Sequence, residues 1–146
     1  MAKSSSTSQI VIGIDPGCHT GIATYQDGKL IALDTISPLG LERAIEPADR
    51  VVFEDSRLIS FMFTTVKSRP AALKMARDVG QIDAWSGLIT AICATLNIPC
   101  HGISPKGKGK KLDAKQFALI TGWVGKSNQH ERDAAMTAFQ YRMSSK

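Results

Sequence analysis

Three carboxylates and one imidazole lie where a folded chain would hold them in fixed positions. Asp15 ends an apolar run that begins at Val11, and Glu54 ends a second apolar run. His130 and Asp133 are three residues apart at the start of a predicted helix, a spacing that places both on one face. The residues that could do chemistry therefore come from two strand ends and one helix end.

A cluster of like charges either shifts its pKa values or binds cations. Carboxylates with one imidazole suit Mg²⁺ or Mn²⁺, and two such ions would activate a water and stabilise the leaving oxygen in phosphodiester hydrolysis. Each residue, taken singly, has another interpretation: Asp15 shapes its own turn, and Glu54 caps a strand. His130 packs or caps its helix, and Asp133 interacts favourably with the helix dipole. Four independent coincidences would be needed, so the joint pattern favours a metal site.

The elements that position these residues predict an α/β fold. Apolar runs bounded by turn residues predict five strands, over 11–15, 21–25, 29–36, 50–55 and 99–104. The first three are joined by short turns and form an antiparallel meander. A long helix between the last two implies a parallel crossover. If the fourth strand lies beside the first, Asp15 and Glu54 meet at one edge of the sheet.

Helical spacing and end signals predict helices over 39–45, 70–96 and 113–121, and a last one that starts at Asn128. The long helix is expected to bend or fray near Gly80 or Gly87, and its apolar positions pack in the core or against a second subunit. Asn128 with Glu131 three residues later is a variant of the capping box.

Composition bounds the class of protein. The chain has 146 residues, 43% hydrophobic and 21% charged, as expected for one soluble globular domain over 9–146. Residues 1–8 are Ser-rich and polar, which predicts a frayed tail and not a secretory signal. No apolar run approaches the roughly 20 residues of a membrane helix. Cys18, Cys93 and Cys100 lack metal-like spacing, so reduced thiols in a cytoplasmic setting are the simplest interpretation.

The charge balance favours a polyanionic partner. Net charge is +5 with an isoelectric point near 9.3. Five lysines fall within ten residues: Lys106, Lys108, Lys110, Lys111 and Lys115. Such a cluster attracts nucleic-acid phosphates, although a solvated flexible loop has the same composition.

Taken in order, these features resemble the RuvC family of Holliday junction resolvases, within the RNase H-like superfamily. The resemblance rests on Ile-Gly-Ile-Asp15-Pro-Gly with Thr20-Gly21, on the strand ending in Glu54, and on His130-Glu-Arg-Asp133-Ala-Ala. It covers nearly the whole chain, and its last part is similar to the compact versions in phage genomes. It implies an RNase H-like mixed five-stranded sheet, three antiparallel strands and then parallel ones, with helices on both faces.

The resemblance also implies an activity. A homodimer would act on branched DNA, especially four-way junctions, inside a bacterial or phage-infected cell. Each subunit would nick one strand, using Mg²⁺ or Mn²⁺. Carried over by position, Asp15, Glu54 and Asp133 match the family's carboxylates, and His130 matches a fourth site that is acidic in some members and histidine in others. These four would be the catalytic and metal-binding residues, with Asp55 as a weaker substitute for Glu54.

The same resemblance assigns DNA contacts. The five lysines fall where the family places basic residues near the scissile phosphate. Their spacing is too irregular to name one catalytic lysine, and Lys111 and Lys115 are the two candidates. Arg57 lies in the segment after Glu54, in which Phe61 or Phe63 would stack on an unpaired base. Burial in the core or in a dimer contact is the alternative for either aromatic ring.

Three other functions are compatible with parts of the sequence. The first motif resembles the first phosphate loop of actin-like ATPases and sugar kinases, but 146 residues leave no room for the second lobe that they need. A non-catalytic branched-DNA binder would gain nothing from the acids Asp15, Glu54 and Asp133. An RNase H-like nuclease for RNA–DNA hybrids or other nucleic acid shares the metal chemistry and stays the main alternative.

Overall fold

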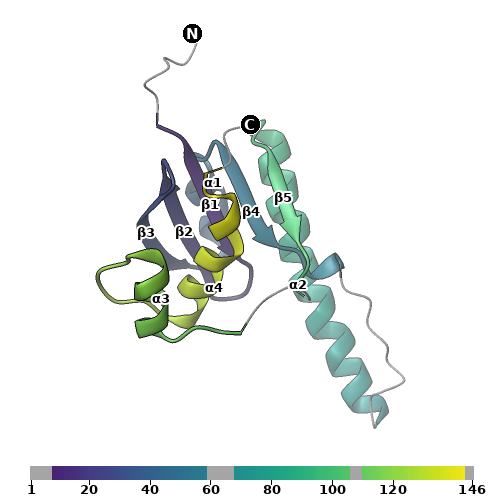
Figure 1. The fold of residues 1–146 in the computed structure, drawn as a ribbon. Helices are drawn as coiled ribbons and strands as arrows, with labels where there is room; N and C mark the ends of the chain where they lie inside the picture. Colours follow the sequence, from purple (N-terminus) through teal and green to yellow (C-terminus); the bar gives the residue numbers. More distant parts are fainter. Residues whose placement is uncertain (1–7, 59–67, 106–109, 144–146) are drawn as a thin grey trace.

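The computed structural model describes residues 8–58, 68–105 and 110–143. Its centre is a five-stranded sheet in the order β3-β2-β1-β4-β5 (Figure 1). β1 pairs with β2 and β2 with β3 in antiparallel fashion, whereas β1–β4 and β4–β5 are parallel. This is the predicted mixed sheet. The strands are β1 (Ile10–Asp15), β2 (Thr20–Gln26), β3 (Lys29–Ile36), β4 (Arg50–Glu54) and β5 (Cys100–Ile103).

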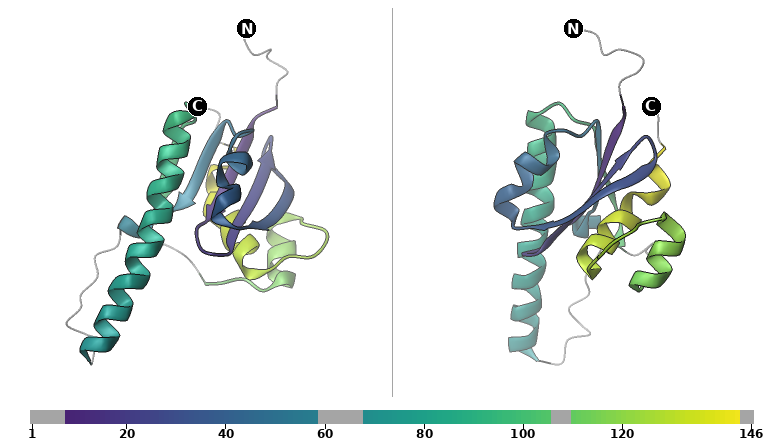
Figure 2. Two further views of the ribbon diagram at one scale, coloured as in Figure 1. Left: turned by 180° about the vertical axis from the view of Figure 1, so that it is seen from behind. Right: turned by 90° about the vertical axis from the view of Figure 1, so that its left-hand side faces the viewer.

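Helices cover both faces of the sheet, as predicted. Edge on, α1 and α2 lie on one side, and α3 and α4 lie on the other (Figure 2). The α-helices are α1 (Leu41–Ile45), α2 (Arg69–Thr95), α3 (Ala114–Thr121) and α4 (Gln129–Ala138). Short 3₁₀ turns are η1 (Pro38–Gly40), η2 (Ser56–Leu58) and η5 (Phe139–Tyr141).

Alternate residues of the central strands enter two separate cores. Ile12 and Ile14 pack with α1 and the end of α2, whereas Val11 faces the opposite core under α4. β4 divides its side chains in the same way. A strand buried on both faces needs apolar residues at nearly every position, which is why its sequence reads as an unbroken apolar run.

The ends of the helices follow local sequence signals. Asp113 caps α3 in a capping box with Gln116, and Gly122 ends that helix in the left-handed conformation, with φ of 75°. Asn128 and Glu131 form the predicted capping box of α4. Most boundaries differ from expectation by one residue; for example, β4 ends at Glu54 and not at Asp55, and the first short helix begins as a 3₁₀ turn.

α2 is partly core and partly projecting. It runs as one continuous helix through Gly80 and Gly87, so the expected interruption is not seen. Ile89 and Cys93 near its end are fully buried, whereas Leu73 near its start is 58% exposed. Figure 1 shows the first half of α2 extending beyond the sheet. Core packing therefore accounts for the second half of the helix and leaves apolar side chains of the first half in solvent.

Two further features bear on the sequence predictions. Within the described ranges, no helix combines the length and the apolar character that crossing a membrane requires. All three cysteines are free thiols, with Cys18 exposed and Cys93 buried. The predicted tail falls outside the described residues, except for Ser8.

Candidate active site

The four residues singled out by their spacing line one cavity. Asp15, Glu54, His130 and Asp133 surround a space of about 380 Å³ at the edge of the sheet. They come from β1, β4 and the first turns of α4. Residues up to 118 positions apart in the chain, Asp15 and Asp133, thus share one small site.

Strand register places the two strand-end carboxylates side by side. In the parallel pair of β1 and β4, Ile14 lies opposite Phe53. The next residues along each strand are Asp15 and Glu54, so both emerge at the same level where the strands end. The side chain of Asp15 is only 17% exposed, so it is much more buried than a typical surface acid. A rigid sheet therefore fixes both carboxylates.

α4 reaches the site because it packs unusually close to the sheet. A Cβ atom at Gly21 of β2 would overlap the carbonyl oxygen of His130, and one at Gly13 of β1 would overlap that of Ala134. The buried face of α4 is itself small, with Ala134 and Ala135 fully covered. Small residues on both sides allow helix and sheet backbones to touch. This close contact places His130 and Asp133 next to Asp15 in the cavity.

Polar contacts hold the start of α4 over the sheet. The Asn128 side chain donates to the hydroxyl of Thr35 on β3 at 2.8 Å, and Thr35 donates to Glu131 at 3.1 Å. Further along, the buried hydroxyl of Tyr25 donates to the carbonyl of Ala135 at 2.7 Å. The residues of the capping box therefore have a second task, which is to anchor the helix at the site.

Two of the carboxylates in the cavity, Asp133 and Asp15, have polar neighbours. The Lys111 ammonium lies 3.6 Å from one oxygen of Asp133, and the Gln129 amide donates to the other oxygen at 2.8 Å. The Nδ1 atom of His130 lies 3.8 Å from a carboxylate oxygen of Asp15. Asp133 is nearly buried, so these partners offset the cost of placing its charge there.

Sequence reasoning missed some residues of this cavity. His19, Cys18 and Gln129 also line it, and the ring of His19 lies 5.8 Å from that of His130. Cys18 and His19 could have been found from the sequence, because they directly follow Asp15-Pro-Gly at the sheet edge where Asp15 lies. Gln129 is the first residue of α4, one turn before Asp133.

The donor set fits a hard divalent ion. Three carboxylates and one imidazole are ligands that Mg²⁺ and Mn²⁺ accept, and Mg²⁺ keeps several waters beside one or two carboxylates. In the described part of the chain, no group of three or more His, Cys, Asp or Glu side chains lies close enough together to hold a metal ion as the side chains stand. Lys111, whose ammonium lies 3.6 Å from Asp133, would compete with such an ion for that carboxylate.

The predicted DNA-binding residues have different positions. Lys111 lines the acidic cavity and Lys110 lines a neighbouring one. Lys115 is exposed on α3 and lines neither. Four residues lie outside the described residues: Phe61, Phe63, Lys106 and Lys108.

Arg57 and Asp55 form a structural pair beside the site. The Arg57 guanidinium donates to both carboxylate oxygens of Asp55 at 2.8 Å, and also to the hydroxyl of Thr90 on α2. Hydrogen bonding from Arg57 holds the pKa of Asp55 below its usual value. Asp55 lines neither cavity, and its carboxylate is engaged. Glu54, which does line the acidic cavity, is the better candidate for catalysis.

We expect Asp55→Asn to destabilise the fold at neutral pH by about 1–2 kcal/mol, a modest value because Arg57 is 40% exposed. The folded pKa lies below the unfolded one, so this stabilisation is present above about pH 4 and is lost as pH falls through the folded pKa. Urea unfolding at pH 7 and pH 2.5 measures it. The gap between wild type and variant should shrink in acid; a constant gap would contradict the pairing.

Comparison with known proteins supports the fold. No family model matches the sequence, and no curated protein matches it significantly. Among solved structures, T. thermophilus RuvC in complex with Holliday junction substrate superposes with a TM-score of 0.60 and 19% identity. The match covers 93% of this chain and 96% of that chain. The chain therefore has a RuvC-like fold, and the predicted RNase H-like class is confirmed.

Proposed function

We propose that this protein is a structure-selective endodeoxyribonuclease that resolves four-way DNA junctions, a compact resolvase of the phage type. The observation that carries the proposal is the single cavity at the sheet edge, lined by Asp15, Glu54, His130 and Asp133. The RuvC-like fold supports it, because the similar protein was solved with a Holliday junction substrate. The basic net charge of +5 suits a DNA ligand.

The reaction is hydrolysis of one phosphodiester bond. Mg²⁺ or Mn²⁺ held in this cavity would supply charge that activates a water and stabilises the leaving oxygen. Asp15, Glu54 and Asp133 would hold the ions, and His130 would be the fourth ligand. An imidazole at this fourth position leaves one negative charge fewer than a carboxylate would, which lowers the repulsion that an approaching phosphate meets.

Lys111 would orient the DNA backbone. Its ammonium already reaches the cavity, 3.6 Å from Asp133, and its side chain is 69% exposed. With the DNA bound, Lys111 would contact a non-bridging oxygen of a phosphate placed in the cavity. Lys111 is thus the best placed of the described lysines to assist cleavage.

A homodimer would place two such cavities on one junction. The projecting first half of α2 supports this part of the proposal, because Leu73 there is 58% exposed and Ile82, at the middle of the helix, is 38% exposed. Apolar side chains exposed along one helix are a typical subunit contact. Two active sites with one symmetry axis suit a junction whose strands are related in pairs.

A cleavage panel tests the proposal. The substrates are a synthetic four-way junction, a linear duplex of the same sequence, an RNA–DNA hybrid and a plasmid with an extruded cruciform. With Mg²⁺ or Mn²⁺ we expect paired nicks in the junction and much weaker cutting of the duplex. A dimer makes both nicks before dissociating, so the cruciform plasmid should become linear and not merely nicked.

The panel has clear adverse outcomes. Equal cutting of duplex or hybrid would replace the resolvase with a broader RNase H-like nuclease. Binding of the junction without cleavage in either metal would favour a non-catalytic branched-DNA binder. Cleavage that persists in excess EDTA would remove the metal from the mechanism.

A further inference from the structure

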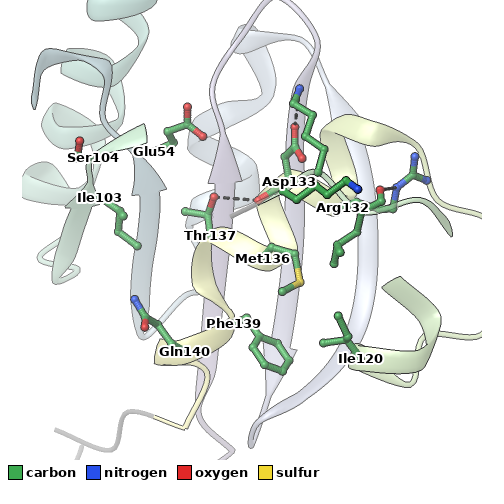
Figure 3. Close-up of a pocket in the computed structure, with 13 residues that line it drawn as sticks. Glu54, Ile103, Ser104, Ile120, Arg132, Asp133, Met136, Thr137, Phe139 and Gln140 are labelled. Atoms are coloured by element: carbon green, nitrogen blue, oxygen red, sulfur yellow. Dashed lines mark hydrogen bonds and ion pairs between the residues drawn. The ribbon is translucent and has the colours of Figure 1, made fainter. Parts of the chain in front are cut away.

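A second cavity of about 510 Å³ adjoins the acidic one. Apolar side chains from three elements form it: Ile103 on β5, Ile120 on α3 and Met136 on α4, with Phe139 and Leu112. Figure 3 shows Met136 and Phe139 between Ile103 on one side and Ile120 on the other. Its volume lies within the range of about 300–1,000 Å³ that is usual for small-ligand pockets.

The two cavities share a wall. Glu54, Lys111 and Asp133 line both of them. A ligand with a phosphate at the acidic cavity would therefore have its adjoining chemical groups within reach of the apolar one. Lys110 and Lys111 add positive charge to the rim. An apolar cavity thus lies next to the proposed phosphate site, with two lysines at its entrance.

We propose that this apolar cavity receives an unstacked nucleobase next to the scissile phosphate. The inference rests on the proposed function, and it names the part of the substrate that is read beside the cut. A base is flat and apolar on both faces, and one sugar connects it to its own phosphate. A phosphate in the acidic cavity would therefore place its base within reach of the adjoining apolar cavity. Enzymes that move a base out of the stack hold it against aromatic and apolar side chains.

The cavity also has groups that would read the edge of a base. Ser104 and Gln140 line it beside the apolar residues (Figure 3). An amide presents both a donor and an acceptor, and a hydroxyl can serve as either. The cavity would therefore prefer some bases to others, and so impose a sequence preference on the position of the cut.

Two neighbouring residues of α3 give a matched test. Ile120 lines the cavity and is 48% exposed, whereas Leu119 is 80% exposed and does not line it. Ile120→Glu and Leu119→Glu add the same charge to the same helix. Ile120→Trp, which fills the cavity without adding charge, is a second probe. Circular dichroism and thermal melting check that each variant folds.

The first readout is the rate of junction cleavage. Losing one stacked base costs about 5- to 160-fold, so kcat/KM should fall by that factor in both Ile120 variants. Leu119→Glu should stay close to wild type. The second readout is sequence preference, mapped on junctions that differ in the bases flanking the cut; it should weaken in the Ile120 variants.

Fluorescence locates the base itself. Junctions carrying 2-aminopurine at each position within three nucleotides of the mapped cut are bound to the Asp15→Asn protein. One position should brighten on binding, and Ile120→Glu added to that protein should remove the signal. Equal rates for the Leu119 and Ile120 variants, with no brightening, would overturn the inference while leaving resolvase activity intact. Absence of junction cleavage by the wild type would instead defeat the proposed function.

Discussion

We expect Asp15→Asn to slow cleavage of a four-way junction by at least about 10²-fold and to leave binding to it nearly unchanged. The amide has the shape of the carboxylate but lacks its charge, and Asp15 is held at the end of β1 beside Glu54 by strand register. Removing one electrostatic group aimed at the reacting centre costs about 10²- to 10³-fold or more. Single-turnover cleavage in Mg²⁺ measures the loss, and a gel shift in EDTA measures binding.

Asp34→Asn is the matched control for this prediction. Asp34 is an exposed residue of β3 and lines neither cavity, so the same chemical change there should leave cleavage intact. If Asp15→Asn still cut the junction, Asp15 would not belong to the mechanism. If it lost binding as well, its carboxylate would matter for the fold or the complex and not for the chemical step.

Gly21→Ala should impair catalysis without touching any catalytic side chain. An added Cβ would overlap the carbonyl oxygen of His130, so the first turn of α4 must move away from the sheet. His130 and Asp133 move with it. Overpacking of this kind destabilises by about 1–3 kcal/mol, and a shift of about 1 Å at a catalytic group costs about 10²-fold in rate. Urea unfolding and single-turnover cleavage measure the two effects.

Gly80→Ala is the control for the second prediction. Gly80 lies in α2, and a Cβ there would meet nothing within 4 Å. Alanine in a helix interior is about 0.5–1 kcal/mol more favourable than glycine, so this variant should gain stability and keep its activity. A Gly21→Ala protein as active as the wild type would show that α4 does not need this close contact.

Much of the fold was predictable because its signals are local. Apolar runs predicted all five strands, and the long helix between β4 and β5 predicted their parallel pairing. Asn128 with Glu131, and Gly122, act on backbone groups within one helical turn, so their effect is written in adjacent residues. For the same reason, the candidate carboxylates were recognisable as the residues that end strands or open a helix.

The proximity of the site's components was decided by the tertiary structure. Nothing in the spacing of Gly13 or Gly21 shows that α4 will lie on them, and Lys111 is 22 residues from the Asp133 that it meets. The exposed half of α2 has the same helical pattern as its buried half, because periodicity records which residues share a face and not what covers it.

The chain by itself therefore determined which residues could do chemistry and on which elements they stand. The tertiary structure decided that Asp15, Glu54, His130 and Asp133 share one cavity, with Lys111 beside Asp133 and an apolar cavity next to it. The physical reason is the distance along the chain over which each kind of interaction acts. Backbone angles, caps and strand alternation depend on neighbours in sequence, whereas a site depends on the close packing of surfaces from distant segments.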